Sequence, residues 1–342
     1  MSVCGNSRKL FFLAVNTGFV ESGLPDQRCH DFYIERSRNG LYCAIVGNVL
    51  IPGGVGSNNA CAEISSAAAW RRLAEGISEQ GALPGIQLTT AWRGFQGMKG
   101  FISAPGTDIL HEYRQVTALM SPFDVERTFS ALCRGSELAF KAGFRHLQLH
   151  AAHGYLFSLL VDRRLSPHSD LAVGLIRRWA NDVASWGGES SLRFSLWSGH
   201  PSIDEDGQAQ FLDIIVSLPV DYLDVSAGFY NIDKRLIYPS LPDLLSARRT
   251  ATLELAKRHP RAQFIMSGKS SGAWGTSLSA NMHVGICRDL IANPNFLRDR
   301  EEGCNDCMKC HYFSRGQSQL TCGRWAYPKT LSPMQNIEKI VG

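Results

Sequence analysis

The sequence predicts an α/β protein, a (β/α)8 TIM barrel followed by a short cysteine-rich C-terminal segment. Eight short apolar segments rich in branched residues alternate with helical stretches, which is typical of βα units and a parallel sheet. The alternation occupies about 300 residues, within the size range of such barrels. A doubly wound open sheet is the main alternative, but "AVNTGF" after the first segment lacks the G-x-G-x-x-G pattern expected there.

Each expected strand is a short apolar segment, and each expected helix has apolar residues at helical spacing. The strands expected are Lys9–Val15, Leu41–Val49, Gly85–Thr89, His146–Ala152, Leu192–Trp197, Tyr222–Gly228, Gln263–Gly268 and His283–Arg288. The helices expected are Cys61–Ile77, Val125–Ala142, Leu175–Ser185, Gln208–Ser217 and Leu244–Arg258.

Composition narrows the class of protein. The 342 residues include 35 basic and 31 acidic side chains, a balance that argues against nucleic acid as a partner. No run of about 18 apolar residues predicts a membrane span, and the N-terminal run "LFFLAV" is too short for a secretion signal. Ten cysteines without an export signal indicate reduced thiols or metal ligands, so we expect a cytoplasmic protein.

The carboxyl ends of barrel strands line the active site, so the residues there are considered together. Two late glycine-containing stretches, "SGKSSG" and "VGICR", occur where barrels commonly bind phosphate, although ordinary turn glycines are the alternative. The residues expected at the strand ends are Thr17, Asn48, Gln87, His150, His153, Tyr155, Arg193, Ser226, Gly268, Gly285 and Arg288.

The stretch "LQLHAAHGYL" places two histidines and a tyrosine at the end of one expected strand. His150 and His153 are three residues apart and would point to opposite faces of a continuous strand. If the strand ends near Ala151 and the chain turns, both side chains can point into the barrel mouth. Two neutral imidazoles there could donate hydrogen bonds to a carbonyl or phenolate oxygen, and Tyr155 could supply a proton. A metal pair and satisfied core histidines are the alternatives.

Four cysteines after the last expected strand have the spacing C-x2-C-x2-C-x11-C; they are Cys304, Cys307, Cys310 and Cys322. Four thiolates with two tight spacings and one remote member suit an iron–sulfur cluster. A structural zinc site and free thiols are the alternatives. We expect His311 to lie at the surface or behind the ligands rather than among them.

Several stretches resemble the Old Yellow Enzyme family of FMN-dependent oxidoreductases, in order and over most of Leu10 to Phe296. They are "FLAVNTGFVESGLP", "GLYCAIVGNV", "IQLTTAWRG", "AGFRHLQLHAAHGYL", "LRFSLWSG", "YLDVSAGFY" and "GICRDLIANP". The similarity is greatest to the branch that contains trimethylamine dehydrogenase and 2,4-dienoyl-CoA reductase. The chain ends at Gly342, so we expect it to lack the C-terminal nucleotide-binding domains of that branch.

This resemblance implies that FMN lies across the barrel mouth. It assigns His150 and His153 to the activating oxygen of an unsaturated carbonyl substrate and Tyr155 to proton donation. The cofactor-binding residues it implies are Ala14 and Val15 through their backbone, Thr17 at the flavin carbonyl, Gln87 and Arg193 on the pyrimidine side, and Gly268, Lys269, Cys287 and Arg288 at the phosphate. Asn48 is also expected to bind the cofactor.

The resemblance also implies how the chain works. Residues 1–303 would form the FMN-binding barrel, and residues 304–342 would bind a [4Fe-4S] cluster at the four cysteines. The expected activity is reduction of an activated C=C bond in a small-molecule substrate, with NAD(P)H or an external electron carrier as donor. The alternatives are a dehydrogenase that oxidises an amine or ring and discharges electrons through the cluster, and a non-catalytic barrel that binds zinc. A homo-oligomer is left open.

The sequence departs from the family pattern at several positions. Trp92 replaces a glycine, so we expect an indole that narrows the pocket or stacks on the substrate. Cys287 replaces a glycine of the phosphate turn and is tolerated only if its φ is negative. The Y-G-G turn is absent, and Arg163 or Arg164 is expected to replace part of an arginine-rich stretch.

Overall fold

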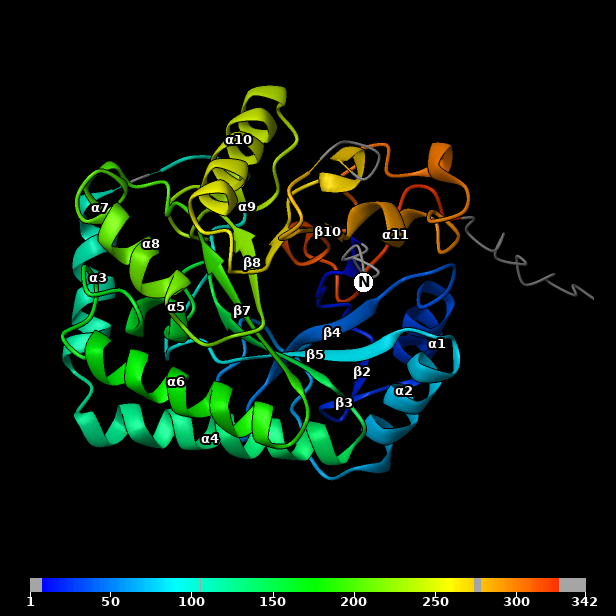
Figure 1. Cartoon of the computed structure of the whole chain (residues 1–342), viewed down its shortest axis with the longest axis horizontal. Coiled ribbons are helices and arrows are strands. Elements are labelled where there is room, and N and C mark those ends of the chain that lie inside the picture. The colour runs from blue at the N-terminus through cyan, green and yellow to red at the C-terminus, as the bar shows by residue number, and fades with distance from the viewer. Residues whose placement is uncertain (1–7, 105, 274–277, 326–342) are drawn as a thin grey trace, which may run out of the picture.

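Eight parallel strands close into a barrel in the computed structural model, which describes residues 8–104, 106–273 and 278–325 (Figure 1). Each strand pairs with the next in the chain, and the last strand, β10, pairs with β1. All eight predicted strands are therefore confirmed. The barrel strands are β1 (Leu10–Phe12), β4 (Cys43–Leu50), β5 (Leu83–Thr89), β6 (His146–Ala151), β7 (Glu189–Ser195), β8 (Tyr222–Ser226), β9 (Phe264–Met266) and β10 (Met282–Ile286).

The strands are apolar because helices cover their outer face and the barrel interior is filled with side chains. All residues of β6 and β8 are buried, polar ones included. The register sets His150 of β6 beside Arg193 of β7, and Arg193 beside Asp224 of β8. Three polar side chains therefore come to one level near the carboxyl ends of neighbouring strands.

Helices form the outer layer, with α4 and α6 packed along each other (Figure 1). Ser121 and Asp124 form a capping box at the start of α4, and Pro122 occupies the first turn, where its missing N–H costs nothing. The longer helices are α1 (Gln27–Arg36), α2 (Ala68–Glu79), α3 (Thr107–Ala118), α4 (Pro122–Lys141), α6 (Ser169–Ser185), α8 (Gln208–Val216) and α10 (Pro242–Arg258).

Four of the five predicted helices match within six residues at their starts, and α2 is the exception. It begins at Ala68 rather than Cys61, because the intervening chain runs beside β4. There the Ile64 N–H donates to the Leu50 carbonyl at 3.0 Å. The backbone hydrogen bonds of this stretch therefore go to a strand, and its apolar spacing does not make it helical.

Short elements shape the loops around the barrel ends. A small hairpin, β2 (Val20–Glu21) with β3 (Leu24–Pro25), lies outside the barrel sheet. The other short elements are α5 (Leu156–Leu160), α7 (Pro201–Asp204), α9 (Lys234–Ile237), η1 (Ser270–Ala273), α11 (Arg288–Ala292), η2 (Arg300–Glu302) and η3 (Phe313–Arg315).

The cysteine-rich segment packs against the barrel as far as it is described, and residues 326–342 of the predicted C-terminal segment lie outside the described residues. Tyr312, Leu320 and Cys322 are buried in the same apolar core as the barrel helices. The Leu320 N–H donates to the Thr17 carbonyl at 2.7 Å, and the Trp325 indole N–H donates to the Ile291 carbonyl at 2.7 Å. Residues 304–325 are therefore held by the barrel core, which their weak apolar pattern did not predict.

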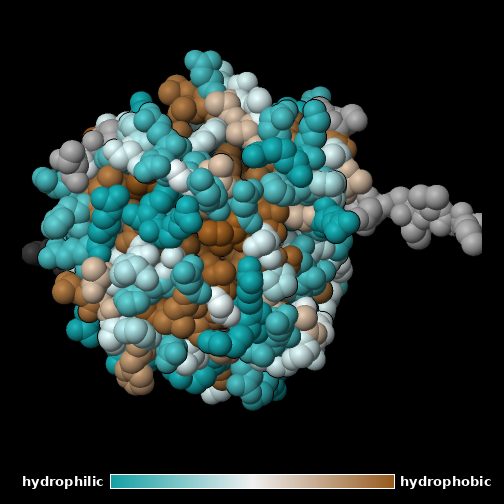
Figure 2. Space-filling model, turned by 60° about the vertical axis from the view of Figure 1, so that its left-hand side comes forward, coloured by the Kyte–Doolittle hydropathy of each residue, from teal (hydrophilic) through white to brown (hydrophobic). Residues whose placement is uncertain are grey.

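Figure 2 shows one face of the molecule, where apolar side chains appear mostly toward the middle and polar ones surround them. Within the described ranges, no helix is both long and apolar enough to cross a membrane.

Two of the phenylalanines of α4 offer a matched test of the outer layer. Phe129 is 1% exposed and packs on Phe157 at a ring separation of 5.2 Å, whereas Phe123 is 68% exposed. We expect Phe129→Ala to lower the free energy of unfolding by about 3–5 kcal/mol, because it leaves a cavity. Phe123→Ala should change it by no more than about 0.5 kcal/mol. Denaturant unfolding of both variants measures this, and equal losses would contradict the packing described.

Candidate active site

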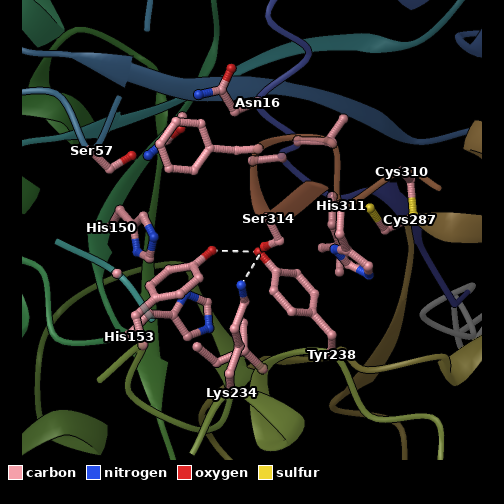
Figure 3. Close-up of a pocket in the computed structure, with 18 of the residues that line it drawn as sticks. Asn16, Ser57, His150, His153, Lys234, Tyr238, Cys287, Cys310, His311 and Ser314 are labelled. Carbon is pink, nitrogen blue, oxygen red and sulfur yellow. Dashed lines mark hydrogen bonds between the residues drawn. The ribbon is translucent and has the colours of Figure 1, made fainter. Parts of the chain in front are cut away.

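A cavity opens at the carboxyl ends of the barrel strands. Its walls include the ends of β1, β4, β5, β6, β7, β9 and β10, and residues 310–314 of the cysteine-rich segment. His150 and His153 lie on one side, and Cys287, Cys310 and His311 lie on the opposite side (Figure 3). The cysteine-rich segment thus supplies one wall of the site.

Most of the predicted site residues meet in this cavity. Thr17 does not line it: the Thr17 hydroxyl accepts the Phe19 N–H at 3.1 Å, and its side chain faces a smaller neighbouring hollow. Asn16 lines the main cavity instead. Ser226 is not among the lining residues either. The predicted residues that line the cavity are Ala14, Val15, Asn48, Gln87, His150, His153, Tyr155, Arg193, Gly268, Lys269, Gly285, Cys287 and Arg288.

The chain turns directly after β6, as the histidine spacing required. His153 has a φ of 66° and Gly154 a φ of 80°, so the backbone leaves the strand line and both imidazoles reach the cavity. The two rings are 5.1 Å apart between centroids. His153 Nε2 lies 2.6 Å from the Ser226 hydroxyl, while the buried His150 Nδ1 contacts no partner within the described part of the chain. His150 therefore keeps a ring nitrogen available.

Both histidines are neutral near pH 7. Burial lowers the pKa of His150 well below its usual value, and the nearby Arg193 lowers it further. Burial also lowers the pKa of His153, with added repulsion from His150 and Arg193. Neutral imidazoles can donate N–H to an oxygen that gains negative charge.

Tyr155 sits against the histidine pair and remains protonated. Its ring lies 4.8 Å from that of His150 and stacks on Phe95 at 5.1 Å. Burial raises its pKa well above 10, and hydrogen bonds with Ser57 and Asn48 only partly offset this. The phenol is therefore a proton reservoir at neutral pH.

Arg193 is held from within the barrel. Its guanidinium pairs with Asp224 at 3.0 Å, and Asp224 also accepts from Gln148 at 3.3 Å. Gln148 in turn accepts from Gln87 at 2.5 Å. The Arg193 Nε is buried and has no partner among the residues described. This series of hydrogen bonds places the Gln87 amide and the Arg193 cation at the cavity floor.

The glycine turn after β9 lies against a second buried arginine. Gly268 has a φ of 89°, and a Cβ there would come within 2.7 Å of the Arg248 guanidinium. Arg248 donates to the Ser267 hydroxyl at 2.6 Å, and its Nε contacts no partner in the described ranges. Cys287 has a φ of −131°, the negative value that a residue with a Cβ needs at this position in place of glycine. Glycine backbone, Arg248 and Arg288 together favour an anion.

Several cavity residues were not identified from the sequence. Arg248 lies inside α10, where an arginine is ordinarily exposed, and Lys234 follows no strand directly. His311 was expected at the surface or behind the cysteines, but it lines the cavity with its ring 3.9 Å from that of Tyr238. The missed lining residues include Asn16, Tyr230, Lys234, Tyr238, Arg248, His311 and Ser314. Apart from Arg248 in α10 and Lys234 in the short α9, they stand on segments without a periodic pattern.

Trp92 does not line the cavity, so the expectation of an indole in the pocket is wrong. It is 6% exposed, and its indole N–H donates to the Gly154 carbonyl at 3.2 Å. Its ring packs edge-on against Phe95 at 5.5 Å. Trp92 thereby supports the turn that carries His153 and the aromatic ring under Tyr155.

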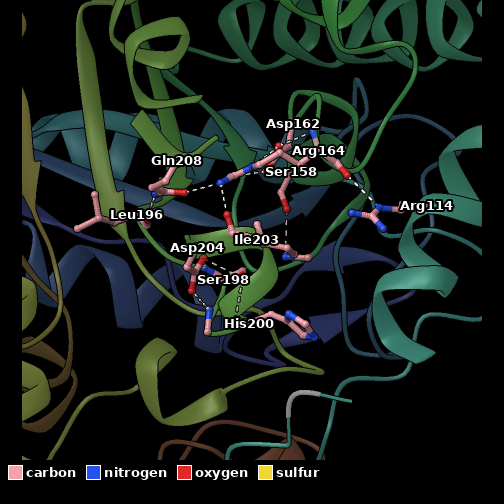
Figure 4. Close-up of polar contacts among 12 residues, drawn as sticks. Arg114, Ser158, Asp162, Arg164, Leu196, Ser198, His200, Ile203, Asp204 and Gln208 are labelled. Carbon is pink, nitrogen blue, oxygen red and sulfur yellow. Dashed lines mark hydrogen bonds and ion pairs between the residues drawn. The ribbon is translucent and has the colours of Figure 1, made fainter. Parts of the chain in front are cut away.

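Arg164 braces the loops behind this turn (Figure 4). It forms a bidentate ion pair with Asp162 and donates to the Ile203 carbonyl at 2.6 Å. Nearby, the Ser158 hydroxyl accepts the Gly154 N–H at 3.1 Å. The loops that follow β6 and β7 are thus joined away from the cavity. Arg164 therefore stabilises these loops and does not line the cavity.

The four predicted ligand cysteines lie in one lobe beside the cavity. Cys307 and Cys322 are within hydrogen-bonding reach of each other, and the Gly323 N–H donates to the Cys307 sulfur at 3.3 Å. Cys310 also lines the cavity. Among the described residues, no group of three or more His, Cys, Asp or Glu side chains is arranged to hold a metal ion.

Comparison with known proteins supplies the class. No protein-family model matches the sequence. An "NADPH dehydrogenase" of Bacillus velezensis is 35% identical over 246 residues, which cover 68% of this chain and 71% of that protein. The "NADH-dependent flavin oxidoreductase iliE" of Hypocrea jecorina is 24% identical over 339 residues, which cover 84% of this chain and 83% of that protein.

Two solved structures have the same fold. Old Yellow Enzyme from Pichia sp. AKU4542 superposes with a TM-score of 0.64 at 16% identity, covering 85% of this chain and 83% of that one. A 2-naphthoyl-CoA reductase in complex with 2-naphthoyl-CoA gives a TM-score of 0.69 at 14% identity. The match covers 93% of this chain but 54% of the reductase, so the chain spans about half its length.

Barrel, cavity and relatives together define a flavin-dependent oxidoreductase. The chain belongs to the Old Yellow Enzyme family of FMN-dependent oxidoreductases. Its residues fit such a cofactor, because the cavity holds unpartnered guanidinium nitrogens on Arg193 and Arg248 and a glycine turn open to an anion.

The neutrality of the histidine pair can be tested directly. We expect His150 and His153 to stay uncharged as the pH falls through 6.5, because burial holds both pKa values below that of the unfolded chain. Below pH 6.5 the unfolded state takes up protons that the folded state refuses, so stability should fall there. NMR of 13C-labelled histidines, assigned with His150→Asn and His153→Asn, measures the charge. Titration of either ring near 6.5 would contradict the burial described.

Proposed function

We propose that this chain uses FMN and a nicotinamide donor to reduce the C=C bond of an unsaturated carbonyl compound. The observation that carries the proposal is the neutral histidine pair beside Tyr155, with an unpartnered nitrogen on His150, in the cavity of a flavin-family barrel. The names of the relatives support NADPH or NADH as the donor.

Different parts of the cavity would bind different parts of the cofactor. Backbone at Ala14 and Val15 and the side chains of Asn48, Gln87 and Arg193 would hold the flavin ring, and the residues near Gly268 and Arg288 would hold its phosphate. Bound FMN supplies hydride transfer to the electron-poor carbon. Thr17 is left out of this set because its side chain faces another hollow.

The histidine pair would bind the substrate oxygen and Tyr155 would move a proton. N–H groups of His150 and His153 donate to the carbonyl oxygen and stabilise the negative charge that develops there. The hydroxyl of Ser226, 2.6 Å from His153 Nε2, helps to fix that ring. Tyr155 holds a proton for the adjacent carbon, and its raised pKa keeps that proton in place until charge develops.

A [4Fe-4S] cluster at the four cysteines belongs to this proposal, with residues 304–325 as its described binding segment. Asp306 and Met308 both have positive φ, and the Asp306 N–H donates to the Cys304 sulfur at 3.3 Å. Such alternation of backbone conformation turns N–H groups toward an anionic centre, as at many iron–sulfur sites. Some rearrangement of the thiols on binding is required, and structural zinc is the competing occupant.

The position of Cys310 also favours a second direction of reaction. Because Cys310 lines the cavity, a cluster there would lie beside the flavin. Electrons could then enter from an external carrier, or leave after oxidation of an amine or ring substrate. Anaerobic flavin reduction by a saturated substrate would support the second direction.

His150→Ala tests the assigned substrate site. We expect para-substituted phenols, which place an oxygen near the histidines, to bind at least about tenfold more weakly, because a donor to a charged oxygen is lost. FMN content should not change. The control His30→Ala is half-buried on α1, away from the cavity, and should bind phenols normally. Unchanged phenol binding in His150→Ala, or no turnover of any enone by wild type, would contradict the proposal.

Iron content tests the cluster. Protein purified without oxygen should contain iron and acid-labile sulfide, and show broad absorbance near about 400 nm beneath the flavin bands. Cys307→Ser and Cys322→Ser should each lower the iron content strongly, whereas Cys133→Ser, on α4, should not. Zinc without iron in wild type would replace the cluster by a structural site.

A further inference from the structure

Lys234 is an unusual cation in the cavity wall. It begins α9, is 3% exposed and faces the cavity near His153 and Tyr238 (Figure 3). A buried ammonium is costly unless hydrogen bonds and a counter-charge compensate it. Its surroundings therefore indicate what compensation is present and what is missing.

Three neutral acceptors surround the ammonium of Lys234. It donates to the Met98 carbonyl at 2.8 Å, to the Lys99 carbonyl at 3.1 Å and to the Ser314 hydroxyl. These contacts satisfy its three protons, and the face of the Phe101 ring lies 4.7 Å from the ammonium, but none of these groups carries a formal negative charge. In the described part of the chain, no carboxylate forms an ion pair with it.

Most other cations that line the cavity form ion pairs with carboxylates. Arg193 pairs with Asp224, and both Lys269 and Arg288 pair with Asp306. Arg248 also lacks an ion pair, but it lies behind Gly268 at the turn assigned to the cofactor phosphate. Lys99 also lines the cavity, but its side chain is exposed. Lys234 is thus the buried cavity cation that neither an aspartate nor the flavin site accounts for, within the residues described.

Ser314 links this charge to the open space of the cavity. Its oxygen accepts a proton from Lys234, so its own hydroxyl proton is free to point elsewhere. Ser314 also lines the cavity. The hydroxyl can therefore donate to a bound group while the ammonium behind it supplies positive charge, an arrangement that suits an anionic oxygen.

We infer that Lys234 and Ser314 form a subsite for a carboxylate carried by the substrate. The favoured substrates are then unsaturated carbonyl compounds that bear a free acid group, held at one end by the histidine pair and at the other by this subsite. The inference rests on the proposed function, because it names the class of substrate for the same cavity.

A matched pair of probes separates charge from shape. The probes are trans-3-benzoylacrylic acid, an enone with a carboxylate, and its methyl ester, which keeps the shape and removes the charge. Affinity is measured with the oxidised holoenzyme from the change in flavin absorbance, so that binding is read without turnover. The quantity of interest is the ratio of the two dissociation constants, ester over acid.

Lys234→Met and Ser314→Ala should both lower this ratio, by about tenfold or more for Lys234→Met, because a charge-assisted contact is lost. Lys234→Arg should keep part of the preference. Lys99→Met removes an exposed charge from the same cavity rim and should leave the ratio within about twofold.

Distinct outcomes overturn the inference or the function beneath it. Equal weakening of acid and ester in Lys234→Met and Ser314→Ala would make the pair a structural clamp only. A change confined to the KM for NADPH would assign the subsite to the donor. Failure of wild type to reduce either probe, with the binding preference intact, would overturn ene-reduction and leave the anion subsite standing.

Discussion

The buried ion pair between Arg193 and Asp224 is the interaction on which the site depends. Two charges are costly to bury, and this pair is sustained by the strand register, which sets them side by side at 3.0 Å. Ser226, two residues beyond Asp224, lies within hydrogen-bonding distance of Arg193, Arg248 and His153. One hydroxyl thus links Arg193 on the cavity floor, Arg248 behind the Gly268 turn and the histidine pair.

This arrangement explains why His150 and His153 can be neutral donors. Arg193 and Arg248 keep positive charge close by, which disfavours protonation of His153 in addition to burial. The same cations would stabilise negative charge on a reduced cofactor or a developing enolate. In the proposed reaction the cations of the cavity floor would therefore stabilise negative charge on both the reduced flavin and the substrate. The neutral imidazoles would orient the substrate oxygen through hydrogen bonds rather than supply positive charge.

The barrel and half of the cavity could be predicted because they follow strand ends. His150, Gln87 and Arg193 occupy alternating strand positions whose direction is fixed by the period of two, so their meeting follows from the fold. Lys234 stands on the four-residue helix α9, and Tyr238 and His311 stand on irregular segments, so their direction depends on contacts between distant parts of the chain. Thr17 was misplaced for the same reason, since it lies beyond the end of β1 and turns toward Phe19.

The cysteine-rich segment shows how an irregular stretch gains a fixed place. It has little apolar periodicity, yet Tyr312 and Leu320 insert into the barrel core, and Ser314 contacts Lys234. A few buried side chains thus hold the whole described part of the cysteine-rich segment against the barrel. The cavity wall nearest the four cysteines is consequently built from the same segment that carries them, which couples any rearrangement of the thiols to the shape of the substrate space.

The left-handed backbone at His153 limits which residues evolution could place there. With φ at 66°, a β-branched or bulky apolar residue would be strained, whereas histidine and asparagine enter this region comparatively readily. Both also carry a side-chain N–H. Aspartate enters this region as readily but has no N–H when ionised, so the turn after β6 narrows the choice to a few polar residues, and only some of these could serve as the second donor that points into the cavity.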